Sequence, residues 1–480
     1  MSVLDGTAVQ NDNPALEPRM SKRQRAILIL LLSSTFLLAA DFSLLTVAIP
    51  VIGDGLGFAV GDLQWISTAF AITSAGFTLL FGRIADLYGR RRMFLAGLAL
   101  LALSSLLGAA ANEPLVLIIA RVLQGVATAM ATPAALALLT TSFPEGPLRA
   151  KALGVNGAMI SAGFTVGAVA GGLLTDLLSW RWAFLINVPI AVAIIVLTPR
   201  LLPESRLAGR AKMDVPGAVT VSTGLIALVY GVSRAGEEGW GDALVLVLLA
   251  AAAVLLTVFY RIELRAESPL ASVRILNKPS VLWGNFGGLI AITMQTAVIF
   301  LATLYLQKVN GLSAMDTGLA FSGLGIAAFV GGVVAPKVVG RFGNRLGLVI
   351  GLTLQVIGPI GLALTASADS SILLVLVLLT VASFGHLTAV VSYMITSTSG
   401  LPNEEQGLAT GLATMTQQVG LAVGIPVMSA IATTRIHAME ATHSATDSVL
   451  SGLRLAFTLD AGVVVLGGLL ILVFLRSRKA

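Results

Sequence analysis

Cysteine is absent from this sequence of 480 residues, which excludes a disulfide framework and a thiolate metal site. Charged residues are scarce as well: they make up 11% of the chain, against 56% hydrophobic residues, a balance too apolar for a soluble globular protein. The sequence also lacks a nucleotide-binding loop, a zinc-type ligand set and a nucleophile constellation. These absences predict a membrane protein that is not an enzyme and needs no metal or cofactor.

Long apolar runs fill almost the whole chain. A bilayer core about 30 Å thick is crossed by roughly 20 apolar residues in a helix, so each run of this length is a candidate span. The pattern predicts an all-α membrane protein with 14 transmembrane helices. We expect the spans at residues 26–50, 63–82, 93–111, 115–139, 150–176, 182–202, 215–234, 242–260, 280–306, 316–336, 346–367, 371–396, 407–433 and 455–475.

The basic residues lie in alternate gaps between these spans. Of the 30 lysines and arginines, 24 fall on one side of the predicted membrane, and only Arg121 lies well inside a span. Because lysine and arginine stay in the cytoplasm, this split predicts a multi-pass protein of the cytoplasmic (inner) membrane with both termini in the cytoplasm. The net charge of +6 then reflects topology and requires no nucleic-acid partner.

Two motifs recur between the halves of the chain. The sequence Gly-Arg-Ile-Ala-Asp-Leu-Tyr-Gly-Arg-Arg at 82–91 is echoed by Pro-Lys-Val-Val-Gly-Arg-Phe-Gly-Asn-Arg at 336–345, and three glycines of span 5 are echoed in span 13 at almost the same offset. Parallel six-helix halves with a substrate site between them are one plan of secondary transporters. We expect a cytoplasmic tail at 1–25, a six-helix bundle at 26–202, two inserted spans with their links at 203–279, a second six-helix bundle at 280–475 and a tail at 476–480.

The connection between spans 2 and 3 carries the sharpest local motif. Its glycines allow backbones to approach each other, and its aspartate can pair with an arginine or with a helix N-terminus. Here the chain resembles the major facilitator superfamily, whose cytoplasmic signature has the same order of glycine, aspartate, glycine and arginines. The resemblance implies a conformational latch that holds the two halves in the outward-facing state; the alternative is a solvated basic loop. The latch candidates are Gly82, Asp86, Gly89, Arg90 and Arg91.

Asp41 in span 1 and Arg121 in span 4 are charged residues deep inside predicted spans. An ionised carboxylate at such a depth costs about 2.5–3.5 kcal/mol on insertion scales, so Asp41 is expected to face water, a partner or a proton. The run from Asp41 to Pro50 resembles the span-1 signature of the fourteen-span drug:proton antiporters, with Thr46 where asparagine is frequent. Arg121, with Gln124 in register, matches the span-4 arginine signature of the superfamily. The resemblance implies proton coupling by Asp41 and Arg121; the alternative is helix packing.

Span 5 carries small residues on one stripe, which permits close contact between helices. It resembles the antiporter motif of exporters in the same superfamily, with Ala168 where that motif usually has proline. The segment from Trp180 to Pro189 resembles the outer loop and span 6 of the fourteen-span exporters, and its tryptophans also fit interfacial anchors. The glycines of the antiporter motif are Gly163, Gly167, Gly171 and Gly172.

Other polar or bulky residues inside spans are expected to line a substrate cavity between the halves, because the repeat places their spans around the centre. Each could instead make a hydrogen bond between helices. His386 could also titrate, since the ordinary pKa of imidazole is about 6.5, and Asp460 is expected to pair with Arg454. The cavity candidates are Gln64, Trp65, Gln124, Asn156, Asn285, Gln295, His386, Tyr393, Gln417 and Gln418.

The resemblance implies a secondary transporter that exports amphipathic drugs or antibiotics in exchange for protons, by alternating access of the two halves. Its expected partners are a small-molecule substrate, protons and the lipid bilayer, with the proton gradient as the energy source and no need for an oligomer. Two alternatives keep the fold: export of one endogenous metabolite, and exchange of a monovalent cation for protons. A non-transporting receptor and a channel are alternatives of other classes, against which the duplicated halves and the embedded charges argue.

Overall fold

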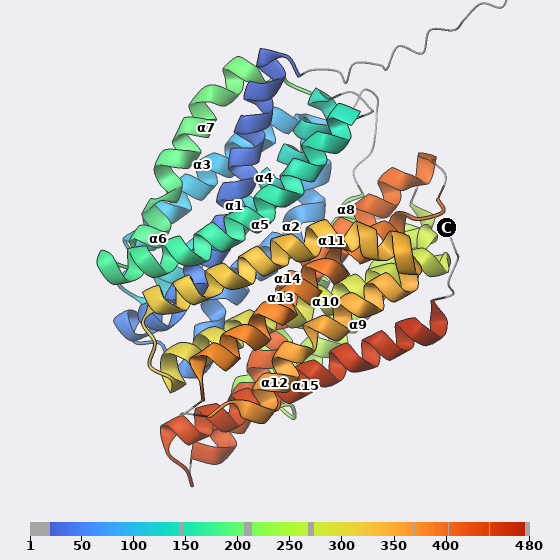
Figure 1. Cartoon of the computed structure of the whole chain (residues 1–480). Coiled ribbons are helices and arrows are strands. Elements are labelled where there is room, and N and C mark those ends of the chain that lie inside the picture. Colours follow the sequence, from blue (N-terminus) through green and yellow to red (C-terminus); the bar gives the residue numbers. More distant parts are fainter. Residues whose placement is uncertain are drawn as a thin grey trace, which may run out of the picture.

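The computed structural model describes residues 20–143, 147–205, 214–266, 273–367, 370–401, 403–440 and 442–475. These residues form helices joined by short connections, with no strand among them (Figure 1). A helix satisfies its backbone polar groups internally, which is what a segment inside lipid requires. The predicted all-α membrane fold is therefore confirmed for this part of the chain.

The N-terminal half begins with a well-defined helix start. The Ser21 hydroxyl accepts a hydrogen bond from the backbone N–H of Gln24 at 3.1 Å. The first helix is capped at its C-terminal end by Gly57, whose φ of 76° favours glycine. The helices of this half are α1 (Lys22–Leu56), the short η1 (Val60–Leu63), α2 (Gln64–Tyr88), α3 (Arg90–Ala109), α4 (Pro114–Ser142), α5 (Pro147–Leu177), α6 (Trp182–Leu185) and α7 (Asn187–Leu201).

A helical hairpin separates this half from the C-terminal half. The hairpin consists of α8 (Val215–Glu238) and α9 (Ala243–Arg265), followed by η2 (Val273–Asn277). The helices of the C-terminal half are α10 (Pro279–Leu304), the π-helical η3 (Tyr305–Val309), α11 (Ala314–Gln355), α12 (Ile357–Thr365), α13 (Ile372–Thr398), α14 (Asn403–Glu440) and α15 (Ala445–Phe474).

Every predicted span lies over helical residues of the structure. By length and composition, the described residues contain 11 helical stretches able to cross a membrane, or 12 when the bent α2 is included. Two features account for the difference from 14. The apolar part of α5, Ala162–Leu177, is shorter than a full span, and Ala314–Thr365 is one continuous stretch that contains two predicted spans. The number of crossings therefore stays a prediction.

One predicted connection is helical. Residues 337–345, expected to be a loop, continue α11, and within that helix only Gly343 departs from helical geometry (φ 81°). Gly89, its expected counterpart in the first half, separates α2 from α3 and also has a positive φ, 128°. Both positions favour glycine because other residues rarely adopt a positive φ. The two echoed motifs thus share a backbone feature.

Two predicted spans are divided between α-helices: 346–367 covers the end of α11 and α12, and 182–202 covers α6 and α7. Residues 182–202 form α6 and α7, which meet at Ile186. The cause lies in Pro189: it has no backbone N–H, so the carbonyl of Leu185 cannot receive the usual hydrogen bond from four residues ahead. The consequence is that Asn187 opens α7 inside the bundle, where its side chain is buried.

The inserted hairpin touches both halves. Ser222 of α8 donates a hydrogen bond to the Gly76 carbonyl of α2. On another turn of α8, Gly236 lies so close to α14 that a Cβ added there would be 2.6 Å from the Ala430 Cα. The α8 helix therefore packs across the seam between α2 and α14, and the hairpin is anchored to each half.

The two halves also contact each other directly at one end of the molecule. Lys308 of η3 pairs with Asp54 of α1 at 2.6 Å, and the Gln307 amide donates to the Val47 carbonyl of α1 at 2.9 Å. Beside them, α5 and α11 approach through Gly172, where an added Cβ would lie 2.4 Å from the Ala314 carbonyl oxygen. We call this region, defined by Val47, Asp54, Gly172, Gln307, Lys308 and Ala314, the closed end.

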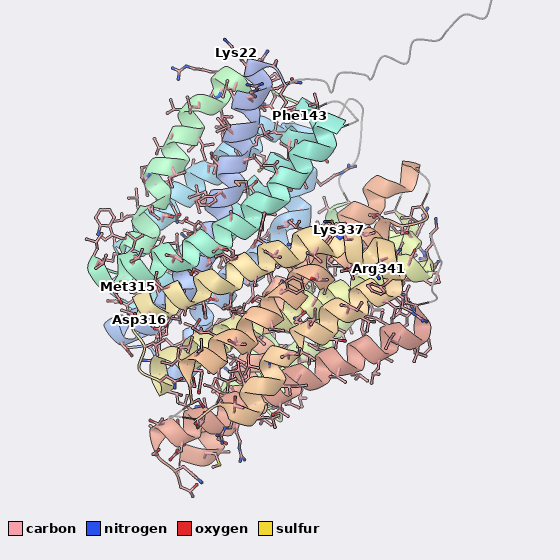
Figure 2. All side chains as sticks on the ribbon, in the orientation of Figure 1. Lys22, Phe143, Met315, Asp316, Lys337 and Arg341 are labelled. Carbon is pink, nitrogen blue, oxygen red and sulfur yellow. The ribbon has the colours of Figure 1, made fainter. Side chains whose placement is uncertain are left out.

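The opposite ends of the halves diverge. Figure 2 places Met315 and Asp316 at the closed end, where α5 and α11 meet. Phe143 of the N-terminal half and Lys337 of the C-terminal half lie apart at the other end. The described conformation is therefore closed on one side of the bundle and spread on the other.

Candidate functional site

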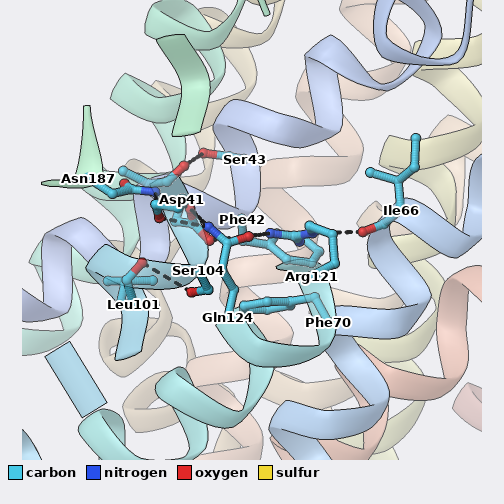
Figure 3. A network of polar contacts seen from close by, with 12 residues as sticks. Asp41, Phe42, Ser43, Ile66, Phe70, Leu101, Ser104, Arg121, Gln124 and Asn187 are labelled. Atoms are coloured by element: carbon cyan, nitrogen blue, oxygen red, sulfur yellow. Dashed lines mark hydrogen bonds and ion pairs between the residues drawn. The ribbon is translucent and has the colours of Figure 1, made fainter. Parts of the chain in front are cut away.

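Asp41 lies in the middle of α1 with only 1% of its surface exposed. Side chains from two other helices donate hydrogen bonds to its carboxylate (Figure 3). The donor atoms are Asn187 Nδ2 at 2.5 Å and Gln124 Nε2 at 3.3 Å from Oδ1, and Arg121 Nη1 at 3.5 Å from Oδ2. Helices α1, α4 and α7 thus meet at one buried carboxylate.

Arg121 of α4 is equally buried, with 1% exposed. Its Nε donates to the Ile66 carbonyl of α2 at 2.8 Å, and its Nη1 donates to Gln124 Oε1 at 2.8 Å. The guanidinium carbon lies 4.4 Å from the centre of the Phe70 ring, whose face attracts a cation. Because arginine keeps its charge in proteins, these acceptors are what allow it to be buried. The sequence-predicted residues Asp41, Arg121 and Gln124 are therefore brought together.

Two members of this network, Asn187 and Ser105, are not among the residues predicted from the sequence. Asn187 bonds to Asp41, and Ser105 of α3 accepts hydrogen bonds from Gln124 at 3.0 Å and from Asn187 at 3.2 Å. Asn187 is the only amide residue in the predicted span at 182–202, a signal that points to it in hindsight. Ser105 offers no such signal, since a serine in a membrane helix can bond to its own backbone.

Protonation of Asp41 would change the hydrogen bonds of this network. A buried ion pair offsets its desolvation only when further hydrogen bonds satisfy the remaining polar atoms. Asp41 has donors from α4 and α7, and Arg121 has additional acceptors on α2 and α4. A proton on Asp41 would cancel its charge and weaken its hold on these donors. Protonation would therefore alter the contacts that α1 makes with α4 and α7.

The predicted latch residues bond within the N-terminal half. Asp86 pairs with Arg90 at 2.7 Å. Glu204, in the segment after α7, accepts a hydrogen bond from the Arg91 backbone N–H at 2.9 Å. Glycine is needed at position 89 next to this carboxylate, because an added Cβ would lie 2.8 Å from the Glu204 carboxyl carbon. Glu204, the only acid between residues 177 and 213, is not among the residues predicted from the sequence. The latching of the halves stays a prediction.

The glycines of the antiporter motif form a seam between helices. Three of them lie against successive turns of α1, where an added Cβ would come within 2.6 Å of a backbone carbonyl oxygen. The fourth, Gly172, lies against α11 of the other half. Helix α5 therefore packs on α1 and on the opposite half at once. The three contacts are Gly163 with Phe36, Gly167 with Ala40 and Gly171 with Leu44.

Most of the predicted cavity residues hydrogen-bond to a neighbouring helix, which agrees with the alternative stated for them. Four of the five pairs lie in the C-terminal half, among α10, α13 and α14. The pairs are Asn156 with Thr35, Asn285 with Thr416, Gln295 with Ser383, His386 with the Ala291 carbonyl and Tyr393 with the Ala413 carbonyl.

The remaining cavity candidates lie on α2 and α14. Gln64 is fully buried, and neither polar atom of its amide has a hydrogen-bond partner. Trp65 packs on Tyr230 of α8, with ring centres 5.8 Å apart. Gln417 is half-buried on α14, and the side chain of Gln418 lies outside the described residues. A substrate role for these residues stays a prediction.

The predicted pairing of Asp460 with Arg454 is wrong. Arg454 instead donates to the Ala366 carbonyl, with its Nε at 2.7 Å. Asp460 is fully buried, and neither of its carboxylate oxygens has a hydrogen-bond partner. The physical reason is helical geometry: at about 3.6 residues per turn, side chains six positions apart point in different directions.

Within the part of the chain that the structure describes, no group of three or more His, Cys, Asp or Glu residues could hold a metal ion. Two apolar grooves, of about 500 and 340 Å³, lie on surfaces formed by α12 with α15 and by α14 with α15 and Trp240. None of the predicted cavity residues lines them. The candidate site is therefore the buried network around Asp41.

Comparisons with known proteins identify relatives over most of this sequence. A model of the Major Facilitator Superfamily matches residues 31–425. The cephamycin export protein CmcT of Amycolatopsis lactamdurans is 38% identical over 85% of this chain and 86% of its own length. The puromycin resistance protein pur8 of Streptomyces alboniger is 35% identical over 94% and 91%.

Among solved structures, a bacterial homologue of the human lysosomal transporter Spinster, in an inward-facing and unoccupied conformation, superimposes with a TM-score of 0.69. The match covers 96% of this chain and 100% of that one, at 15% sequence identity. At such low identity the likeness concerns the fold alone.

Proposed function

This chain belongs to the major facilitator superfamily, and from that premise we propose that it is a drug:proton antiporter that exports small amphipathic antibiotics from the cytoplasm. It is a multi-pass membrane transporter and not an enzyme. The relatives named for cephamycin export and puromycin resistance support antibiotics as the substrate class. The buried network of Asp41 supports protons as the coupling ion.

The observation that carries the proposal is a buried carboxylate whose hydrogen-bond partners come from two other helices. When Asp41 is ionised it attracts Arg121 and accepts hydrogen bonds from Asn187 and Gln124. When it is protonated, Arg121 keeps its hydrogen bonds to the Ile66 carbonyl and to Gln124 but loses its counter-ion, and the hold of α4 on α1 weakens. Because α1 also contributes Val47 to the closed end, this weakening reaches the contact between the halves.

The distribution of lysine and arginine supports an assignment of the two ends of the bundle to the two sides of the membrane. Basic residues predominate on the side where the halves diverge, which the positive-inside rule assigns to the cytoplasm. The described state is then open to the cytoplasm and closed to the outside. In the proposed cycle the halves rock around the buried network, releasing a proton inward and loading substrate from the cytoplasm.

The test is substrate-dependent proton movement. Purified protein would be reconstituted in proteoliposomes with a trapped pH dye, and a panel of cationic and neutral antibiotics would be added under a pH gradient. We expect substrate-triggered proton flux from wild type and none from Asp41→Asn. Asp447→Asn, which alters an exposed carboxylate at the start of α15, is the matched control. Full flux from Asp41→Asn at normal abundance would remove Asp41 from the coupling role.

A second candidate function is export of one endogenous natural product. It is favoured by the names of the relatives at 38% and 35% identity, each of which refers to a single antibiotic. The same panel separates the two candidates. Flux with many unrelated compounds would establish a multidrug exporter, and flux with one structural class would establish a dedicated exporter.

A further inference from the structure

Asp460 is a buried acid that the proposed transport mechanism does not use. Its side chain has 0% exposed surface, and both carboxylate oxygens lack hydrogen-bond partners. Gly467, two helical turns along α15, lies against Ile290 of α10. Since positions seven residues apart share a face of a helix, Asp460 lies on the face of α15 that packs on α10.

The elements around α15 supply no charge to balance an ionised Asp460. Helices α10, α11, α12 and α14 and the short η3 pack against it. Helices α10 and α12 contain no titratable residue at all. On the other elements, the titratable side chains that point toward α15 or the closed end bind partners other than Asp460. The pairs are Arg345 with the Leu472 carbonyl, Arg435 with Ser451, Tyr305 with the Ser367 carbonyl, and Lys308 with Asp54.

The other described charges of these elements lie near helix ends. On α11 these are Asp316, beside its N-cap, and the exposed Lys337 and Arg341 near Gly343; on α14 they are the exposed His437 and Glu440 in the last turn. On α15 itself, Arg454 bonds to Ala366, and Asp447 bonds to Ser444. No described cation therefore faces Asp460.

An ionised carboxylate without partners inside a bilayer is costly. A metal cation would need several oxygen ligands, and no described polar atom bonds to either oxygen of Asp460. One bound proton removes the charge with no further ligand. We propose that Asp460 is a second proton-binding site, filled in the described conformation, and that its proton stabilises the closed end.

Contiguous contacts connect Asp460's helix to the closed end. Arg454 of α15 donates a hydrogen bond to the Ala366 carbonyl. Tyr305 of η3 donates one to the neighbouring Ser367 carbonyl at 2.8 Å, so both side chains bind the same turn. The same η3 segment carries Gln307 and Lys308, which bond to α1 at the closed end. Helix α15 is thereby tied through one turn to the segment that joins the halves.

Opening of the closed end would disturb the surroundings of Asp460. The π-helical η3 continues α10 directly, and π segments are short irregularities where a helix can change its path. When η3 leaves α1, α10 shifts against α15 and water reaches Asp460, which then ionises. Binding equilibria are reciprocal, so a proton on Asp460 must in turn favour the closed end.

The first experiment asks whether Asp460 carries a proton. Infrared spectra of the purified full-length protein would be recorded at neutral pH in a detergent without ester groups. We expect the carbonyl absorption of a neutral carboxylic acid in wild type, its loss in Asp460→Asn, and its retention in Asp447→Asn. Asp460→Glu, which keeps the acid, would show a displaced band. An Asp460→Asn spectrum identical to that of wild type would overturn the proposal.

The second experiment asks whether this proton stabilises the closed end. Because the chain has no cysteine, Ala314→Cys places a unique thiol at the closed end, where Ala314 is 2% exposed. Its labelling by an impermeant maleimide would be measured in the Asp41→Asn background, which removes the titration of Asp41. Rates would be normalised to Thr442→Cys, an exposed position, to correct for ionisation of the thiol.

We expect the normalised labelling of Ala314→Cys to rise several-fold from mildly acidic to mildly alkaline pH. With Asp460→Asn added, which is permanently neutral, labelling should stay slow at both pH values. A pH response that Asp460→Asn leaves unchanged would contradict the proposal. Neither experiment uses a drug or a proton gradient, so failure of drug:proton antiport would leave both results interpretable.

Discussion

Two buried aspartates, one in each half of the molecule, have opposite surroundings. Asp41 of α1 has three hydrogen-bond donors from α4 and α7, one of them the guanidinium of Arg121. Asp460 of α15 has none. Both side chains are almost completely excluded from solvent, with 1% and 0% exposed. Burial alone therefore does not decide what an acid in the membrane does.

The two acids differ in which of their contacts change when they gain or lose a proton. Each donor around Asp41 also contacts a second acceptor, so it keeps a hydrogen bond when the charge of Asp41 changes, while Arg121 loses its counter-ion. An acid in such surroundings can couple proton binding to helix movement. Asp460 has no hydrogen-bond partner to exchange, so in the proposed cycle its charge appears only after the packing of α15 on α10 has opened.

The largest expected effect on thermal stability comes from removing the carboxylate that pairs with Arg121. Asp41→Leu would leave Arg121 buried with no carboxylate, and breaking a buried pair in this way costs about 3–5 kcal/mol. We expect a lower melting temperature, measured by tryptophan fluorescence in detergent. Adding Arg121→Met should restore much of the loss, since an apolar pair needs no compensation. An unchanged melting temperature for Asp41→Leu would show that Arg121 does not depend on Asp41.

A smaller loss is expected when one donor is removed from Asp41. Asn187→Leu deletes the 2.5 Å hydrogen bond to the carboxylate, and bonds to a charged group contribute about 1.5–3 kcal/mol. Asn156→Leu is the matched control, because the bond of Asn156 to Thr35 joins neutral groups worth about 0.5–1.5 kcal/mol. Melting temperatures should fall further for Asn187→Leu. Equal losses would mean that Asp41 behaves as a neutral acceptor.

Removal of the unpartnered acid should cost almost nothing. Asp460→Leu replaces a polar group that has no hydrogen bond with an apolar one of similar size, a change that is nearly neutral or stabilising. We expect a melting temperature equal to or above that of wild type, in contrast to Asp41→Leu. A strong destabilisation by Asp460→Leu would reveal a partner for Asp460 and break the comparison.

The smallest effect is expected at a third aspartate, Asp242, which caps α9 in the α8–α9 turn and lies just before the membrane-crossing stretch Ala243–Arg265. The Val245 backbone N–H, which donates to Asp242 at 3.1 Å, lowers the pKa of Asp242 below its ordinary value. Its stabilisation of α9 is therefore present above the unfolded pKa, about 3.9, and is lost as the pH falls through the folded pKa. Asp242→Ala should melt slightly below wild type at neutral pH and together with it in acid. A difference that persists in acid would contradict this assignment.

The sequence predicted Asp41, Arg121 and Gln124 as site residues because each is polar in an apolar span. It did not predict Ser105 or Glu204, since serines are common in spans and a single acid in a basic loop has many uses. The pairing of Asp460 with Arg454 failed because closeness in sequence is not closeness around a helix. Likewise, the loop expected at 337–345 is helical, because one glycine suffices for the kink.

The sequence by itself determined the membrane fold, the positions of the helices and the presence of charges that need partners. The length of each apolar run and the cost of a charge in lipid are local properties, readable from composition and spacing. Only the tertiary structure decided which partners those charges obtain. It gave Asp41 three donors and Asp460 none, since a partner depends on which faces of distant helices meet, and that is fixed by the packing of the whole bundle.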